Sequence, residues 1–300
     1  MLGGVEAGGT KVVCVIGTGP DDIVASTRID VTDPAATLGT AVAFFVDAVR
    51  EGERLEAIGI GSFGPIELRP GHPRRGMITS TPKPGWSGTD VVGPFATLGL
   101  PIGLDTDVNA AALGEGRWGA ARGLDTFVYL TIGTGIGGGA VVAGRLLHGL
   151  GHPEMGHVPV PRMDGDAFTG SCPFHGDCLE GMACGPAIAA RFGARAEELG
   201  AREQAEAVAL VAHYLAAGCR ALVYSLAPQR IIVGGGLSML PGLLERTRAE
   251  LIAQLGGYPD LPEHAAEGFL VPAQLGTWAG PAGTLILAEQ AARRAGGAGT

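Results

Sequence analysis

The sequence of 300 residues is poor in aromatic and charged side chains, which make up 5% and 17% of it. Basic residues are scarce, with 21 Lys and Arg against 30 Asp and Glu and a formal net charge of −9. Nucleic acids bind basic surfaces, so no nucleic-acid partner is expected. The N-terminus lacks the basic and apolar segments of a signal peptide. The longest uncharged apolar run, residues 127–144, carries six glycines, so no membrane partner is expected.

Cysteine is also rare, with five in the chain. An odd, small number in a long chain favours a reducing compartment, and we expect a cytoplasmic protein. Cys14, Cys184 and Cys219 lie in apolar or helical patterns and are predicted to be core residues. Cys172 and Cys178 lie instead in a segment with little periodicity, which suggests another role.

Glycine, in contrast, is abundant, with 52 residues beside 20 prolines. A hydrophobic content of 46% argues against disorder, so the glycines are expected in turns and where a ligand approaches the main chain. Strand and helix patterns alternate along the chain, which predicts an α/β fold. Strands are predicted near residue 5 and at 12–16, 57–61, 102–104, 126–132, 139–142 and 230–233, and helices at 38–50, 109–115, 185–226, 243–255 and 282–292.

Two segments have a similar layout of apolar residues around a glycine turn, Val5 to Val13 and Leu130 to Val142. Two halves that each open with such a hairpin suggest two domains with a ligand cleft between them. We place the domains at 1–115 and 116–300, with the final helix at about 281–295 packing back on the first. The alternative is chance, because glycine is so common here.

The glycine segments do not fit the familiar nucleotide motifs. Residues 8–11, Gly-Gly-Thr-Lys, fail the P-loop spacing, and a strand pattern follows them where a helix is required. The GxGxxG at Gly133, Gly135 and Gly138 is likewise followed by a strand pattern, unlike a Rossmann fingerprint. What remains is a hairpin turn whose N–H groups hold phosphate oxygens, or a turn with no ligand. A third glycine run at 234–236 adds weight to the first alternative.

A predicted strand-to-helix junction carries Asp105, Asp107 and Asn109. One acid there is suited to capping the helix, and the alternative is a general base that takes a proton from an attacking hydroxyl.

The aperiodic loop at about 152–182 holds His157 and the spacing Cys172-x-x-His175-x-x-Cys178. Two thiolates and two imidazoles suit tetrahedral Zn²⁺ with no open position, so a structural site is expected. Reduced thiols without metal are the alternative, and His148 and His152 are rival ligands.

Taken in order, several motifs resemble the ROK family of sugar kinases. They are Glu6-x-Gly-Gly-Thr-Lys, Gly64-Pro65, Asp107-x-Asn-Ala-Ala, the Thr131 glycine segment, Glu154-Met-Gly-His157 and Cys178-Leu-Glu180, and Thr81-Pro-Lys-Pro-Gly-Trp86 is most like the zinc-containing bacterial fructokinase branch. The resemblance implies a two-domain actin/hexokinase-like ATPase fold, built from duplicated ribonuclease H-like domains, with an active-site cleft between them.

The resemblance also implies residue roles. Asp107 matches the catalytic base, and Glu6, where many members have Asp, would help to position Mg²⁺. The ATP-binding positions are Gly8, Gly9, Thr10, Lys11, Thr131, Gly133, Thr134, Gly135, Gly234, Gly235 and Gly236. The sugar positions are Gly64, Asn109, Glu154, His157 and Glu180. His157, Cys172, His175 and Cys178 match the zinc ligands.

The expected activity is ATP-dependent phosphorylation of a hexose, D-fructose to fructose 6-phosphate, by a homodimer. Alternatives within the family are a glucokinase or mannokinase, an N-acetylhexosamine kinase, or a non-catalytic sugar-responsive regulator. Family repressors carry a helix-turn-helix ahead of the kinase-like part, and the first hairpin here leaves no room for one.

Overall fold

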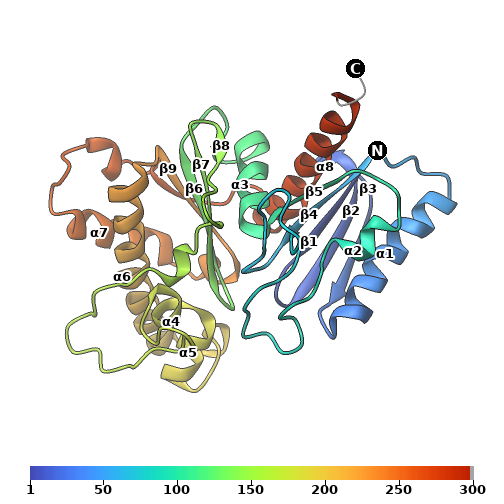
Figure 1. The fold of residues 1–300 in the computed structure, drawn as a ribbon. Coiled ribbons are helices and arrows are strands. Elements are labelled where there is room, and N and C mark those ends of the chain that lie inside the picture. Colours follow the sequence, from blue (N-terminus) through green and yellow to red (C-terminus); the bar gives the residue numbers. More distant parts are fainter. Residues whose placement is uncertain (298–300) are drawn as a thin grey trace. The chain divides into compact units, whose positions relative to one another are not determined.

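The computed structural model describes residues 1–297, which form two compact units (Figure 1). Of the described residues, the first unit comprises Met1–Arg122, Leu147–His152 and 277–297. The second comprises Gly123–Leu146 and Pro153–Gly276. The chain therefore enters each unit more than once, and a six-residue segment, Leu147–His152, belongs to the first unit although both its neighbours in sequence belong to the second.

The first unit is built on a five-stranded sheet. Its strands are β1 (Leu2–Ala7), β2 (Lys11–Gly19), β3 (Asp22–Asp30), β4 (Ala57–Ser62) and β5 (Ile102–Thr106), in the order β3-β2-β1-β4-β5. Strand β2 pairs in antiparallel fashion with both β1 and β3. Strand β4 pairs in parallel with β1, and β5 pairs in parallel with β4. The helices of this unit are α1 (Pro34–Arg50), α2 (Gly93–Ala96), α3 (Asp107–Trp118) and α8 (Ala279–Gly297).

The two faces of this sheet are packed differently. The alternating strand β4 places Ile58 and Ile60 in a core with Phe45 of α1 and with Phe95 and Trp86. On the other face Gly59 lies under α8, where an added Cβ would come within 1.8 Å of the Thr284 carbonyl oxygen. Small residues on that face thus let α8 lie directly against the strands, and large ones build the core on the other.

The second unit repeats the architecture. Its strands are β6 (Phe127–Ile132), β7 (Ile136–Val142), β8 (Arg145–Leu146), β9 (Arg230–Gly234) and β10 (Leu270–Pro272), in the order β10-β9-β6-β7-β8. Strands β6 to β8 are antiparallel, and β9 and β10 are parallel to β6, so each strand has a counterpart from β1 to β5. The helices are α4 (Leu179–Ala183), α5 (Gly185–Phe192), α6 (Ala201–Leu226) and α7 (Leu243–Leu255).

The short 3-10 helices are Met155–His157, Ala196–Glu198, Gly236–Met239, Pro262–Ala265 and Gly276–Trp278.

The matching strand orders confirm the predicted α/β fold and show that the internal similarity is a structural repeat. Residues 127–144 form the β6–β7 hairpin, as expected of a run that is not a membrane span. Cys14, Cys184 and Cys219 are buried and unpaired, as predicted.

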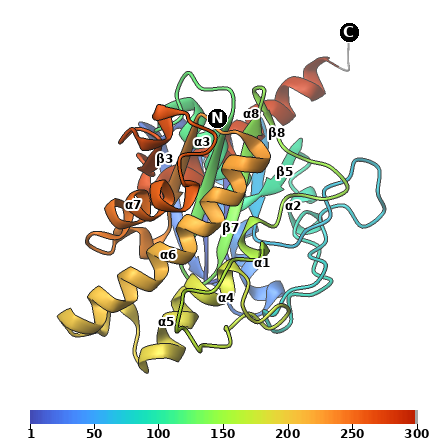
Figure 2. The same ribbon diagram turned by 90° about the vertical axis from the view of Figure 1, so that its left-hand side faces the viewer.

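The structure corrects one expectation from the sequence and adds three strands to those expected. The single helix predicted over 185–226 is two helices, because α5 ends at Gly193, which has a φ of 74°. Strands β3, β8 and β10 were not predicted. Within the described residues, α6, which Figure 2 shows along its length, is the one helix long and apolar enough to cross a membrane. In the protein 67% of its apolar window is buried, as in a core helix.

Candidate functional site

Asp107 is the first residue of α3, directly after β5. The helix is capped by Thr106, whose side chain accepts a hydrogen bond from the Asn109 amide at 3.1 Å. Neither acid is therefore the cap, which corrects that alternative from the sequence. Burial raises the pKa of Asp107 to about 6. A carboxylate with a pKa near working pH is suited to proton transfer.

Glu6, in β1, is a second carboxyl group of the first unit whose pKa is raised. Burial, and then the negative charge of Asp107, raise the pKa of Glu6 to about 7, while Lys11 lowers it. The Glu6 carboxylate lies against the start of α8, where a Cβ on Gly280 would come within 2.0 Å of Oε1. Two acids and a lysine thus share one electrostatic environment, and oxygen donors of this kind suit Mg²⁺.

The turn between β1 and β2 carries Gly8, Gly9, Thr10 and Lys11. It is closed by a hydrogen bond from the Gly8 amide to the Lys11 carbonyl at 2.9 Å. Gly9 and Thr10 are exposed, and nothing lies within 4 Å of where a Gly9 Cβ would stand. The turn therefore leaves room for a ligand against its main chain.

Asn109, on the first turn of α3, is buried and held by Asp105. Its Nδ2 donates to Oδ1 of Asp105 at 2.6 Å, and His148 donates from Nε2 to Oδ2 of Asp105 at 3.0 Å. Among the described residues the Oδ1 of Asn109 has no hydrogen-bond partner. Asp105 and His148 also line a cavity of about 280 Å³ within the first unit. The sequence singled out Asn109, but nothing in it predicted the contact with His148.

Gly64 follows β4 and precedes Pro65 in a cis peptide bond. A Cβ on Gly64 would lie 3.1 Å from the ring of His152. Nε2 of His152 accepts a hydrogen bond from the Ile66 amide at 3.1 Å. His148 and His152 are therefore engaged within the first unit, which corrects their consideration as rival metal ligands.

In the second unit, the β6–β7 turn carries Gly133, Thr134 and Gly135, directly after Thr131 and Ile132. The Gly133 amide donates to the Gly135 carbonyl at 2.9 Å. Glu180, on α4, accepts from the Ile136 amide at 2.9 Å through Oε2 and so lies beside this turn.

The glycine run 234–236 ends β9 next to the same turn. Gly235 has a φ of 85°, and a Cβ there would come within 2.3 Å of the Ile132 carbonyl oxygen. A Cβ on Gly133 would lie 3.9 Å from the Gly236 amide nitrogen. The structure thus brings together two of the three glycine segments predicted to bind ATP, and the main chain is open at Gly133 and at Gly236, where nothing lies closer than 3.9 Å to a Cβ position.

The four predicted metal ligands meet in the second unit. The ligand atoms of His157, Cys172, His175 and Cys178 all lie within 4.8 Å of one another. Nδ1 of His157 lies 3.7 Å from Sγ of Cys172 and 3.5 Å from Sγ of Cys178, and Nδ1 of His175 lies 3.7 Å from Cys172 Sγ. Bonds of ~2.3 Å to sulfur and ~2.0 Å to nitrogen in a tetrahedron put ligand atoms ~3.5 Å apart. The residues therefore fit Zn²⁺.

Glu154 precedes this cluster and lies at the start of the 3-10 helix Met155–His157. Its carbonyl accepts from the His157 amide at 3.0 Å, so the two predicted sugar ligands are held one turn apart. Nδ1 of His157 faces the two sulfurs, so Nε2 lies on the opposite side of the ring.

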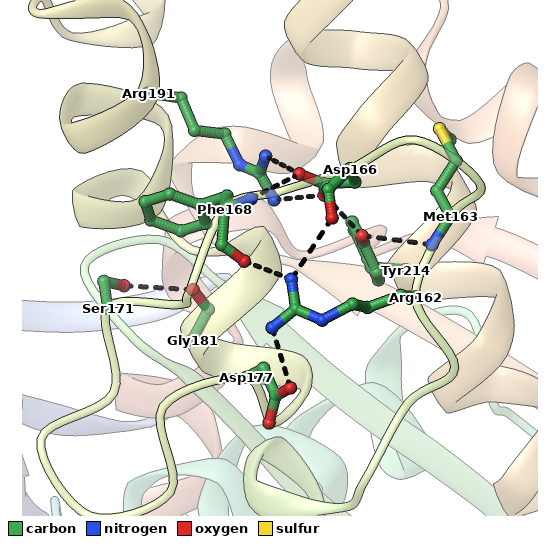
Figure 3. Close-up of polar contacts among 9 residues, drawn as sticks. All are labelled: Arg162, Met163, Asp166, Phe168, Ser171, Asp177, Gly181, Arg191 and Tyr214. Carbon is green, nitrogen blue, oxygen red and sulfur yellow. Dashed lines mark hydrogen bonds and ion pairs between the residues drawn. The ribbon is translucent and has the colours of Figure 1, made fainter.

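A network that the sequence did not reveal fixes the rest of the loop that carries the candidate metal ligands (Figure 3). Both guanidinium amino groups of Arg191 donate to Asp166 at 2.8 Å, and the Tyr214 hydroxyl donates to the same carboxylate. Arg162 reaches across the loop to Asp177 at 2.9 Å, beside the candidate ligand Cys178. The bidentate pair and its neighbours therefore tie the loop to α5 and α6 through protein contacts.

Residues 2–291, nearly the whole chain, match the sequence profile of the ROK family. The chain belongs to the ROK family. It is 40% identical to a fructokinase of Zymomonas mobilis over 291 residues, 96% of each chain. Among solved structures it resembles the ROK hexokinase of Thermus thermophilus, with 29% identity, a TM-score of 0.79, and coverage of 98% of this chain and 99% of the other.

A second ROK structure, the glucokinase of Streptomyces griseus in complex with glucose and AMPPNP, is 27% identical with a TM-score of 0.75, covering 96% of this chain and 99% of that one. These likenesses confirm the family and the hexokinase-like ATPase fold that the resemblance implied.

Proposed function

We propose that this ATP-dependent sugar kinase of the ROK family transfers the γ-phosphoryl group of ATP to the 6-hydroxyl of D-fructose. The observation that carries the choice of sugar is the likeness to fructokinases and a putative fructokinase, which are 37–42% identical to this chain. The matched glucokinases are more distant, at 30% identity. The fructose 6-phosphate formed and ADP are the products.

In this proposal Asp107 is the general base. Its carboxylate takes the proton of the sugar hydroxyl as that oxygen attacks the γ-phosphorus and the bond to the β-phosphate oxygen breaks. The raised pKa of Asp107, to about 6, supports the assignment, because such a carboxylate is ionised at neutral pH and still basic enough to accept a proton. General-base help of this kind contributes ~10²–10⁴-fold in rate.

The glycine turns are proposed to bind ATP. Gly8 to Lys11 in the first unit, and Thr131, Gly133, Thr134 and Gly135 in the second, would hold phosphate oxygens on main-chain N–H groups and hydroxyls. Gly234, Gly235 and Gly236 would lie beside the adenosine, with open space at Gly236, where nothing lies within 4 Å of a Cβ position. Mg²⁺, when bound near Glu6, neutralises charge on the phosphate oxygens. Positioning and charge neutralisation supply most of the catalysis in phosphoryl transfer.

The sugar is proposed to be held by Gly64, Asn109, Glu154, His157 and Glu180. The unpartnered Oδ1 of Asn109 supports this, because a buried acceptor needs a donor and a sugar hydroxyl supplies one. Zn²⁺ is proposed as a structural ion that fixes His157 through Nδ1 and orders the loop that bears Glu154 and Glu180. This would place the chain in the zinc-containing fructokinase branch.

The test is a coupled assay of ADP release with ATP and a panel of fructose, glucose, mannose and N-acetylhexosamines. We expect the highest kcat/KM with fructose. Preference for another hexose would replace the proposed acceptor while keeping the kinase, and ATP left intact with every sugar would refute the proposal. A homodimer in the cytoplasm is also proposed, and light scattering that gives the mass of one chain would contradict the dimer.

A further inference from the structure

Asp105 fixes which way the amide of Asn109 points. A carboxylate only accepts hydrogen bonds, so the group that faces it at 2.6 Å must be the Nδ2 donor of Asn109. Rotating the amide by half a turn would place two oxygens against each other in a buried site, since Asn109 is 1% exposed. The Oδ1 acceptor is thereby forced to the side away from Asp105.

His148 reaches the same carboxylate beside Asn109. Its Nε2 lies 3.0 Å from Oδ2 and 3.2 Å from Oδ1 of Asp105, so it acts as a donor to the carboxylate. With donors from His148, from Asn109 and from the Thr106 amide at 2.8 Å, the buried carboxylate is held in one orientation. Nε2 of His148 also lies 3.4 Å from Nδ2 of Asn109, but because both nitrogens donate to Asp105 they do not bond to each other, and His148 acts on Asn109 through Asp105.

The segment that supplies His148 is itself anchored to the first unit. Leu147–His152 belongs to that unit, and His152 accepts from the Ile66 amide at 3.1 Å, next to Gly64. His148 of this segment thus contacts Asp105, which holds Asn109. His152 contacts the backbone next to Gly64. Both of these are positions proposed to hold the sugar.

We infer that His148, acting through Asp105, is a positioning residue that orients Asn109 so that its Oδ1 accepts a hydrogen bond from a hydroxyl of the sugar. This inference rests on the proposed function for its ligand. It adds His148 and Asp105 to the residues that determine sugar affinity, although neither needs to touch the sugar.

The experiment compares His148→Leu, which removes the donor, with His148→Gln, whose amide keeps one. The His148 side chain is 38% exposed, so neither change leaves a cavity in the core. His72→Leu is the matched control, since His72 belongs to the same unit, is 30% exposed and also lies beside a carboxylate, that of Glu67. Circular dichroism and melting temperature check that all variants are folded.

We expect His148→Leu to raise the KM for the sugar about tenfold, the size of one lost hydrogen bond to a charged group. The KM for ATP should stay within twofold, and His148→Gln should restore most of the sugar affinity. In the sugar-free protein, the side-chain amide signal of Asn109 in a ¹⁵N NMR spectrum should shift in His148→Leu and not in His72→Leu.

An unchanged sugar KM and an unchanged Asn109 signal in His148→Leu would overturn the positioning role in an active enzyme. An equal rise in both KM values, without rescue by glutamine, would point to general disruption and would also overturn it. If the wild type used no sugar at all, the proposed function would fail first and this inference with it.

Discussion

Glu6 and Asp107 lie in one unit close enough that the negative charge of Asp107 adds to burial in raising the pKa of Glu6 to about 7. Burial raises the pKa of Asp107 as well, to about 6. A charge on the base proposed for catalysis therefore opposes a second charge on Glu6 beside it.

Replacing Asp107 by Asn should remove most of the turnover and leave the sugar bound. Asparagine keeps the shape of the side chain but accepts no proton, so kcat should fall ~10²–10⁴-fold. Steady-state kinetics give kcat, and calorimetry gives the Kd for the sugar, which should stay within a few-fold. A kcat near that of the wild type would show that Asp107 is not the base.

The pH dependence should have opposite signs for activity and for stability. The pKa values of Glu6 and Asp107 are raised above their ordinary values of 4.5 and 3.8, so the folded protein keeps protons that the unfolded chain has released. Stability of the protein free of ATP and Mg²⁺ should therefore fall as pH rises from ~4 to ~7, whereas kcat/KM should rise with an apparent pKa near that of Asp107, about 6.

Urea unfolding at several pH values measures the first trend. Glu6→Gln removes one of the two groups, so its stability should fall less steeply over the same range. A variant with the same slope as the wild type would contradict the shift at Glu6.

Removal of the metal should cost both stability and activity. Metal analysis should find about one zinc per chain in the wild type and none in Cys178→Ser. That variant should melt lower and lose sugar affinity, because the loop with Glu154 and His157 loses its cross-link. Cys219→Ala is the control, a buried cysteine of α6 outside the cluster, and it should keep its zinc. A wild type folded and active without metal would refute the site.

Asp166→Asn should destabilise the protein by about 3–5 kcal/mol, the range for breaking a buried ion pair. The side chains of Arg191 and Asp166 are 9% and 7% exposed, so the guanidinium would be left buried without its carboxylate. Arg191 holds the pKa of Asp166 well below its usual range, so this contribution should be lost in acid, as pH falls below ~4.

Urea unfolding checks the value, with Asp164→Asn as the control two residues earlier on an exposed side chain. If both substitutions lower the free energy of unfolding by the same amount, the Asp166–Arg191 ion pair stabilises the protein no more than an exposed acid of the same loop does.

Gly235→Ala should weaken ATP binding more than sugar binding. An alanine Cβ at 235 would come within 2.3 Å of the Ile132 carbonyl oxygen and would push the β6–β7 turn from the glycine run. Gly242→Ala is the control, because Gly242 has a similar φ of 77° with nothing near its Cβ position. We expect the KM for ATP to rise at least tenfold in the first variant only. Equal effects would show that the positive φ alone matters.

The sequence predicted the features that are local. The two hairpins follow from apolar residues around glycine turns, and the metal ligands from the spacing between Cys172 and Cys178. The meeting of a strand pattern and a helix pattern singled out Asp105, Asp107 and Asn109, and the resemblance to the ROK family selected Asp107 among them. In each case the residues that matter are neighbours in sequence, so their spacing carries the information.

The features that were missed depend on distant or weak signals. Strand β3 is half exposed and carries Asp22, Arg28 and Asp30, so its pattern is not that of a core strand, and β8 and β10 have two and three residues. The contact of His148 with Asp105 joins residues 43 positions apart, and that of Arg191 with Asp166 joins residues 25 apart. No local pattern specifies such pairs.

Helix α8 packs against β1, β4 and β5, yet it is translated after every strand of both sheets. On the ribosome, the part of the glycine-lined face that α8 covers therefore stays open until the second unit has all of its strands and helices, and α3 alone lies against that face of β4. We expect the half of the chain that is made first to finish folding last. A chaperone that binds nascent chains would find its target on that open face.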